Sequence, residues 1–220
     1  MAKAKKHRKF YTKNLKDRLT MEQINTINRA IRIKKSALNL DKIIEKYRNM
    51  YYRCYSDNNH ETHPYNESST ICDEWLDETD GLFNFSMWCI QNYYEIDGEE
   101  AVHLDKDILV KGNTVYSPDT CCFVPVKINT MFSGSTKKSD NDLPKGITYS
   151  ERTGKYKPYV VGFDGKVVRN SGWYETPEEA WEVYALHRKA WIMVVADMYK
   201  EYIPTKLYEA MIKWELSIND

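Results

Sequence analysis

The chain has 220 residues, of which 42% are hydrophobic, enough for one medium domain or two small ones. Lysines plus arginines balance aspartates plus glutamates at 32 each, so the formal net charge is zero. The longest apolar run, residues 190–196, is too short to cross a membrane, and the first ten residues are charged and lack the apolar core of a secretory signal. These features argue against a membrane or secreted protein, and we expect a cytoplasmic protein with no membrane partner.

Charge is distributed unevenly along the chain. Residues 1–50 hold 15 lysines and arginines against 4 acidic residues, a net charge of +11, whereas residues 51–100 hold 1 against 12, a net charge of −11. A basic arm beside an acidic block is typical of a protein that holds a polyanion, although a solvated basic tail explains residues 1–20 about as well. The candidate phosphate contacts of this basic region are Arg8, Lys9, Arg29, Arg32, Lys34 and Lys35.

Helical patterns follow the basic arm within residues 1–50. Thr20 with Gln23 three residues later has the spacing of a capping box, which predicts a helix beginning at Thr20. Apolar residues then recur at helical spacing and predict two buried faces. The first face contains Ile24, Ile27, Ile31 and Leu38, and the second contains Leu40, Ile43, Ile44 and Tyr47.

The middle of the chain, residues 51–132, reads as a separate central domain. Residues 55–70 are polar and contain a proline, so they predict a loop. A helix is expected around FNFSMWCIQNYY, and residues 101–126 are typical of strands. Residues 133–145 are rich in Ser, Asp and Lys and predict a linker, which places the main domain boundary there.

The sequence VHLDKDIL carries the candidate chemistry. His103, Asp105 and Asp107 alternate, and alternate residues of a strand share one face. An imidazole with two carboxylates could activate water and bind a divalent cation, which is what metal-assisted phosphodiester hydrolysis requires. The other interpretation is a solvated strand face with no catalytic role.

The C-terminal segment, residues 146–220, has a different pattern. Short strands are predicted at KGITYS, KYKPYVVGF and KVVRNSGWY, the last two joined by the hairpin sequence Asp164-Gly165. Thr176 is a candidate helix cap and Pro177 suits a first helical turn, so a helix is expected from there towards Tyr199. We therefore expect three strands and a helix.

This segment resembles the AP2 DNA-binding domain. The resemblance lies in Gly146-Ile147, Lys155-Tyr156, Val160, Gly172, Tyr174, Thr176, Glu178-Glu179-Ala180 and Tyr184. It implies that the face of the sheet enters the major groove of DNA. The DNA contacts that it implies are Arg152, Lys155, Lys157, Tyr159, Lys166, Arg169 and Trp173. Tyr156, Tyr159 and Trp173 could instead be the packed face of a small sheet.

The central segment resembles the HNH-type, or ββα-metal, endonucleases of bacteriophages. The arrangement that carries the resemblance is RCYS, HPYNESSTICDEWL, FNFSMWC and VHLDKDILVKGNTVYSPDTCCFVPVKIN. It implies a Mg²⁺ or Mn²⁺ ion held by Asp105 or Asp107 and by Asn129, with Asn113 in the hairpin turn. The His-His or Asp-His dipeptide of that family is absent, so His103 or an Asp would act as general base. The resemblance also implies a phage-encoded protein working in a bacterial host cell.

Three function classes follow from these features. The first is an HNH-type endonuclease of α+β fold that cuts or nicks DNA, and the second is a DNA-binding or phage accessory protein without catalysis. The third is an interaction protein whose acidic segments, residues 73–80 and 95–100, contact a host or phage protein. A structural zinc site is not expected, because the spacing of Cys54, His60, His63 and Cys72 matches no known zinc ribbon or finger.

Overall fold

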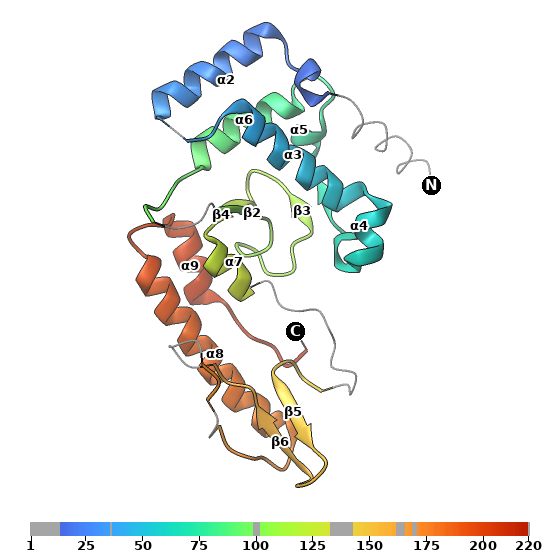
Figure 1. Cartoon of the computed structure of the whole chain (residues 1–220), viewed down its shortest axis with the longest axis vertical. Coiled ribbons are helices and arrows are strands. Elements are labelled where there is room, and N and C mark those ends of the chain that lie inside the picture. The colour runs from blue at the N-terminus through green and yellow to red at the C-terminus, as the bar shows by residue number, and fades with distance from the viewer. Residues whose placement is uncertain are drawn as a thin grey trace. The chain divides into compact units, whose positions relative to one another are not determined.

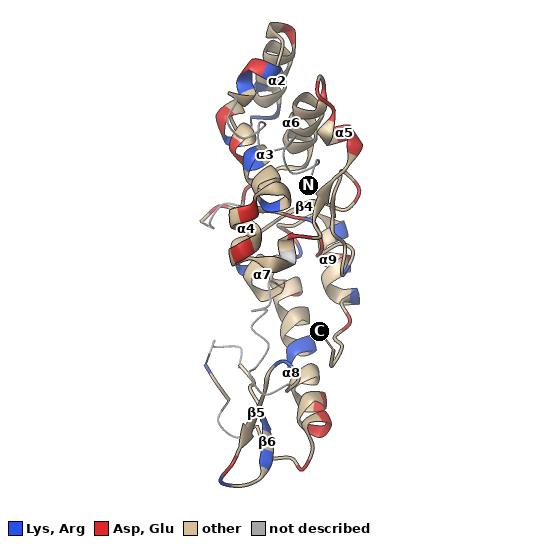
Figure 2. Cartoon of the chain, turned by 90° about the vertical axis from the view of Figure 1, so that its right-hand side faces the viewer, with Lys and Arg blue, Asp and Glu red and all other residues tan. Residues whose placement is uncertain are grey.

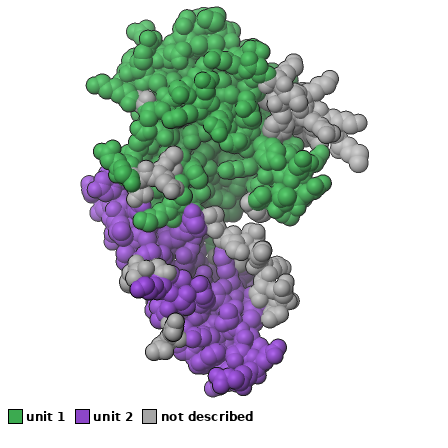
Figure 3. Space-filling model, in the orientation of Figure 1, with its two compact units in different colours: residues 1–129 green, residues 130–220 purple. Residues whose placement is uncertain are grey.

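The computed structural model describes residues 14–35, 37–98, 102–132, 143–161, 166–168 and 171–219. The chain divides into two compact units, residues 1–129 and 130–220 (Figure 3). Helices combine with small two-stranded sheets, so the mixed α+β class predicted from the sequence is confirmed (Figure 1). Arg8, Lys9, Arg169 and the Asp164-Gly165 turn lie outside the described residues, as does most of the predicted linker.

Unit 1 begins with helices that follow local sequence signals. A short 3-10 helix, η1 (Leu15–Arg18), precedes α2 (Met21–Lys34) and α3 (Leu40–Tyr55). The predicted capping box of α2 is confirmed, since the Gln23 N–H donates to Thr20 Oγ1 at 3.1 Å and the Thr20 N–H donates to Gln23 Oε1 at 2.8 Å. The helix α3 crosses residue 50, where the sequence suggested a boundary, and it shares its core with later elements.

The core of unit 1 lies between α3 and α6 (Gly81–Asn92), with the short α5 (Asp73–Leu76) beside it. Tyr47 and Phe85 are fully buried with ring centroids 5.2 Å apart, and Trp75 meets Phe85 edge-on at 5.0 Å. The Tyr47 hydroxyl donates to the Trp75 carbonyl at 2.5 Å, which satisfies its polar end. These aromatic residues of α3, α5 and α6 therefore form a core.

The polar segment predicted as a loop is partly helical. It contains α4 (Asp57–Thr62) and a 3-10 turn, η2 (Pro64–Asn66). Ser56 caps α4 by accepting from the Asn59 N–H, and the buried Asn59 accepts from Asn66 Nδ2 at 2.8 Å. The loop prediction was wrong for these residues because side-chain amides and hydroxyls supply the stability that an apolar stripe supplies elsewhere.

Two small sheets follow in the strand-rich segment. β1 (Thr70–Ile71) pairs in parallel with β3 (Val115–Tyr116), and β2 (His103–Asp105) pairs antiparallel with β4 (Cys122–Val124). A turn before Asn113 contains Gly112 with a φ of 78°, a conformation that glycine adopts without strain. The helix α7 (Val126–Phe132) comes next.

Unit 2 contains β5 (Ile147–Ser150), β6 (Lys155–Pro158), the long helix α8 (Pro177–Tyr199) and α9 (Thr205–Lys213). β5 and β6 pair antiparallel, and isolated bridges place the returning segment along the other edge of β6, through Tyr156 with Tyr174 and Val161 with Val167. Thr176 caps α8 and Pro177 lies in its first turn, as predicted, and Glu179 completes a capping box with Thr176. The predicted third strand, residues 166–174, contributes only the isolated bridges among its described residues, so the sheet has two strands and the prediction of three was wrong.

Candidate functional site

The pairing register of the C-terminal sheet decides which side chains share a face. Thr148 lies opposite Lys157, and Ser150 lies opposite Lys155. Ile147 and Pro158, the neighbouring pair, are buried, and α8 packs on β5 and β6. Because side chains alternate across a sheet, Lys155 and Lys157 point away from α8.

The returning segment adds residues to the same face. The bridge between Tyr156 and Tyr174 puts Trp173 opposite Lys157 and Glu175 opposite Lys155. Two side-chain contacts agree with this register. Lys157 Nζ lies 5.3 Å from the centroid of the Trp173 ring, and Lys155 Nζ lies 2.5 Å from Glu175 Oε1. We define the open face by the residues Thr148, Ser150, Lys155, Lys157, Trp173 and Glu175.

Of the remaining DNA contacts predicted for unit 2, those that the structure describes are exposed. Arg152 is exposed in the turn between β5 and β6, and Lys166 is exposed in the returning segment. Tyr159 and Trp173 are 52% and 47% exposed. Figure 2 shows lysine and arginine positions along β6 and its turn. The structure thus brings Lys155, Lys157 and Trp173 together on one face of the sheet. The alternative of a packed aromatic face fits the half-buried Tyr156, whose ring lies 5.0 Å from that of Tyr149, but not the exposed Tyr159 and Trp173.

The basic residues of α2 fall into two groups. Arg29, Arg32 and Lys35 are exposed on the helix surface or at its end. Lys34 also lies at the surface, but its Nζ donates to the carbonyls of Gln91 at 2.8 Å and Tyr93 at 2.9 Å, at the C-terminal end of α6. A cation there satisfies carbonyls that have no partner within the helix, so the structure gives Lys34 a structural contact.

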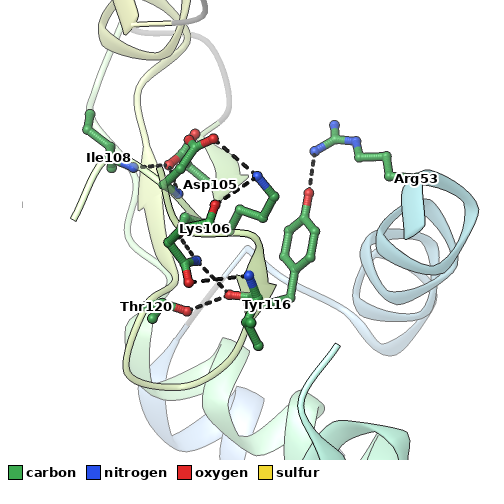
Figure 4. A network of polar contacts seen from close by, with 9 residues as sticks. Arg53, Asp105, Lys106, Ile108, Tyr116 and Thr120 are labelled. Atoms are coloured by element: carbon green, nitrogen blue, oxygen red, sulfur yellow. Dashed lines mark hydrogen bonds and ion pairs between the residues drawn. The ribbon is translucent and has the colours of Figure 1, made fainter. Parts of the chain in front are cut away.

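The predicted row of His103, Asp105 and Asp107 is interrupted. His103 and Asp105 lie in β2 on the same side of the strand, but β2 ends at Asp105. Asp105 Oδ1 accepts the backbone N–H groups of Asp107 at 2.9 Å and Ile108 at 2.7 Å (Figure 4). This turn diverts the chain, so the prediction of one continuous strand through Asp107 was wrong.

The turn after β2 is part of a polar network (Figure 4). Lys106, whose side chain is only 13% exposed, donates to Asp107 Oδ2 at 3.1 Å, and its Nζ lies 5.7 Å from the Tyr116 ring centroid. Asn113 Nδ2 donates to the carbonyls of Lys106 at 2.6 Å and Val115 at 2.8 Å. The side chains of Asn113 and Lys106 therefore fix the conformation of the acidic turn.

Burial and its acidic neighbour change the protonation of Asp105. Desolvation, followed by the nearby charge of Asp107, raises the pKa of Asp105 to about 6, although its accepted hydrogen bonds oppose the rise. A carboxyl group with this pKa exchanges its proton near neutral pH. Such a group is a functional candidate when it also lies near a second carboxylate.

Of the predicted metal ligands, Asp105 and Asp107 lie together in the turn after β2, and Asn129 lies in a separate element. Asn129 lies in α7, which follows β4 directly, with its N–H donating to the Pro125 carbonyl at 2.9 Å. Within the described ranges, no three His, Cys, Asp or Glu side chains converge as a group that could hold a metal ion. Asp105 and Asp107 therefore stand as a pair of carboxylates, with His103 not joined to them in such a group.

The residues of the zinc alternative lie in local contacts. Cys54 is buried in α3, and burial raises its pKa to about 12. A ring nitrogen of His60 lies 3.0 Å from the Arg53 carbonyl, and one of His63 lies 2.8 Å from Thr62 Oγ1. Cys72 is half-buried with a raised pKa. Burial therefore favours the protonated form of both thiols.

The acidic middle segment is built into the surface of unit 1. Asp77 Oδ1 accepts the N–H groups of Thr79 and Asp80, which lowers the pKa of Asp77. Asp80 accepts from Gln23 Nε2 at 2.8 Å, and Arg18 donates to the carbonyls of Asp77 and Glu78. These contacts hold the segment to η1 and α2. Glu99 and Glu100 of the second acidic stretch lie outside the described residues.

Sequence reasoning missed three features of these sites. It assigned no role to Lys106, to Tyr116 or to the Lys155–Glu175 pair. The first two could be suspected only from their closeness to Asp107 and Asn113 in the chain, whereas Glu175 becomes a partner of Lys155 only once the register is known.

Comparisons with known proteins add no family. No protein-family model matches the chain, and no curated protein or solved structure is significantly similar to it. Among the described helices, none is both long and apolar enough to cross a membrane.

Proposed function

We propose that this chain binds DNA and that the open face of unit 2 is one of its contact surfaces. The observation that carries the proposal is the grouping of Lys155, Lys157 and Trp173 on the side of the sheet away from α8. Lysine ammonium groups contact phosphates, and an exposed indole can pack against sugar or base. The AP2 resemblance assigns DNA contact to the same three residues.

The charge of unit 2 alone does not explain strong binding. Lys155 is partly neutralised by Glu175, and residues 151–220 hold 10 basic against 11 acidic residues. We therefore assign most of the electrostatic attraction to the basic segment, residues 1–50, including Arg29, Arg32 and Lys35 of α2. The open face would then contribute position and base contact, and the basic segment would contribute charge.

The direct test is binding of a fluorescein-labelled duplex measured by anisotropy at increasing salt. Phosphate contacts release counterions, so the affinity should fall by about tenfold or more between ~50 and ~200 mM salt. A chain that does not bind, or that binds equally at every salt concentration, would rule out this proposal. Competition by unlabelled single-stranded DNA and by RNA identifies the preferred nucleic acid.

The second candidate is metal-assisted hydrolysis of the bound DNA in the manner of the HNH endonucleases. It is favoured by the Asp105–Asp107 pair, whose backbone is fixed by the turn after β2 and by Asn113. These two carboxylates, with Asn129, would hold Mg²⁺ or Mn²⁺, which would polarise the phosphate and stabilise the leaving oxygen. His103 or a carboxylate would accept the proton of the attacking water.

Incubation of supercoiled plasmid with the protein and Mg²⁺ or Mn²⁺ tests this second candidate. Nicked or linear product that disappears in Asp107→Ala would support it. The same lack of product from wild type and Asp107→Ala, in a preparation that still binds DNA, would leave the non-catalytic DNA-binding protein as the function. In that case the acidic middle segment becomes a candidate surface for a host or phage protein.

A further inference from the structure

The helix α8 carries a row of exposed apolar side chains. Leu186, Met193, Val194 and Met198 are 72%, 44%, 37% and 61% exposed, and Ala190 between them is exposed as well. Their spacing places them along one side of the helix. The opposite side packs within unit 2 through residues Ile192, Val195, Ala196 and Tyr199. Single exposed apolar residues are common, but a continuous row over more than three helical turns marks a contact surface.

We propose that a second copy of this chain covers the row, with its own α8 running antiparallel. Four of the five residues of the row are arranged symmetrically about Ile192. Leu186 and Met198 lie six residues on either side of it, and Ala190 and Val194 lie two residues on either side, whereas the counterpart of Met193 is the half-buried Trp191. In an antiparallel pair with two-fold symmetry, Leu186 therefore meets Met198 and Ala190 meets Val194. A surface that complements itself in this way is what a symmetric dimer requires.

The charges beside the row favour the same pairing. His187 and Asp197 are both exposed and lie five residues on either side of Ile192. Ten helical residues separate them by about 15 Å, so they do not pair within one chain. The antiparallel pair instead brings His187 of each copy to Asp197 of the other. A parallel pair would set Asp197 against Asp197, which repels.

Asp197 is available for this second interaction. One of its oxygens accepts from the Tyr208 hydroxyl of α9 at 2.9 Å, and a carboxylate has further acceptor positions. Glu182, Asp197 and Glu201 lie beside the row with the exposed Lys200, so the acidic charges outnumber the basic one, which disfavours an anionic lipid surface as the occupant. The charge pattern therefore selects another copy of α8 over a membrane.

Sedimentation velocity at about 5–200 μM tests the proposal, because a row only about 18 Å long predicts a weak dimer. Wild type should shift from monomer towards dimer over this range. Leu186→Ser with Met198→Ser should lower the association constant by about tenfold or more. The control Met21→Ser, at an equally exposed residue of α2, should leave it unchanged. Sedimentation of wild type as a monomer throughout would overturn the proposal.

A charge exchange separates antiparallel pairing from other self-association. His187→Glu alone and Asp197→Lys alone should each weaken the dimer by several-fold, since each places like charges together or removes the attraction. The double variant restores opposite charges across the two-fold axis and should recover most of the association. If the double variant loses as much association free energy as the two single variants together, the two residues do not meet and the antiparallel pairing is wrong. Circular dichroism of each variant confirms that α8 remains folded.

Discussion

Gly146 lies directly against the ring of Tyr184. A Cβ atom added at Gly146 would stand only 2.4 Å from Cε2 of that ring, so the contact has no room for a side chain. Gly146 precedes β5 with a φ of 82°, and Tyr184 lies in α8. Gly146→Ala should therefore destabilise unit 2 by about 2–4 kcal/mol, combining left-handed strain with the steric overlap. Urea unfolding followed by tryptophan fluorescence measures the loss.

Gly154 provides the matched control for Gly146. Its φ is 66°, but a Cβ there meets no atom within 4 Å. Gly154→Ala should cost only about 1–2 kcal/mol, the strain contribution alone. In a Tyr184→Ala background the cost of Gly146→Ala should fall to the same level. An unchanged cost in that background would show that Tyr184 is not what requires a glycine at residue 146.

Much of the fold follows from local sequence signals. The capping residues Thr20 and Thr176 begin α2 and α8 where predicted, because a side-chain cap depends only on residues three positions apart. The helix α4 was not predicted, because its sequence has no periodic apolar pattern. It is stabilised instead by a buried hydrogen bond between Asn59 and Asn66. The closeness of Gly146 to Tyr184 also depends on packing between distant segments, which no local pattern reveals.

Lys34 should behave differently from the other basic residues of α2. Lys34→Met keeps most of the side-chain length but removes the donors to the Gln91 and Tyr93 carbonyls. We expect unit 1 to lose about 1 kcal/mol of stability, since the contact is largely exposed. Thermal unfolding followed by circular dichroism measures this loss.

Arg32→Gln is the matched comparison for Lys34→Met, since Arg32 is exposed on the same helix. It removes the same charge and should change stability by less than about 0.5 kcal/mol while weakening DNA binding. Equal effects of both variants on stability would contradict the structural role assigned to Lys34.

Asp105 should make unit 1 less stable as the pH rises from about 4 to about 6. Its pKa is raised to about 6, above the ordinary value of 3.8, so the folded chain binds the proton more tightly than the unfolded chain. The stability contributed by this group is complete below about pH 4 and is lost as the pH rises through about 6. The free energy of unfolding of wild type, relative to that of Asp105→Asn, should therefore fall by on the order of 1–2 kcal/mol between these pH values.

Urea unfolding of both proteins at pH 4, 5, 6 and 7 gives this difference, because Asn at residue 105 does not titrate. Asp107→Asn should shift the wild-type dependence to lower pH, since the charge of Asp107 contributes to the raised pKa. A stability difference that stays constant across this range would mean that folding does not raise the pKa of Asp105.

The candidate sites were predictable in residue type more than in arrangement. Lys155, Lys157 and Trp173 were identified from a resemblance alone. Their pairing with Glu175 and with each other required the register across three segments. The prediction that His103, Asp105 and Asp107 share one strand face was wrong for Asp107. The N–H groups of Asp107 and Ile108 donate to the Asp105 side chain, so the strand ends at Asp105.

Duplex binding by Lys157→Gln and Trp173→Ala tests the central claim most directly. Each should lower the affinity by about 5- to 30-fold, and Lys157→Gln should also reduce the slope of log affinity against log salt by about 1. Lys213→Gln removes the same charge from α9, where Lys213 pairs with Glu209, and should leave the affinity nearly unchanged. Equal affinities for wild type, Lys157→Gln and Trp173→Ala would contradict the assignment of DNA contact to the open face.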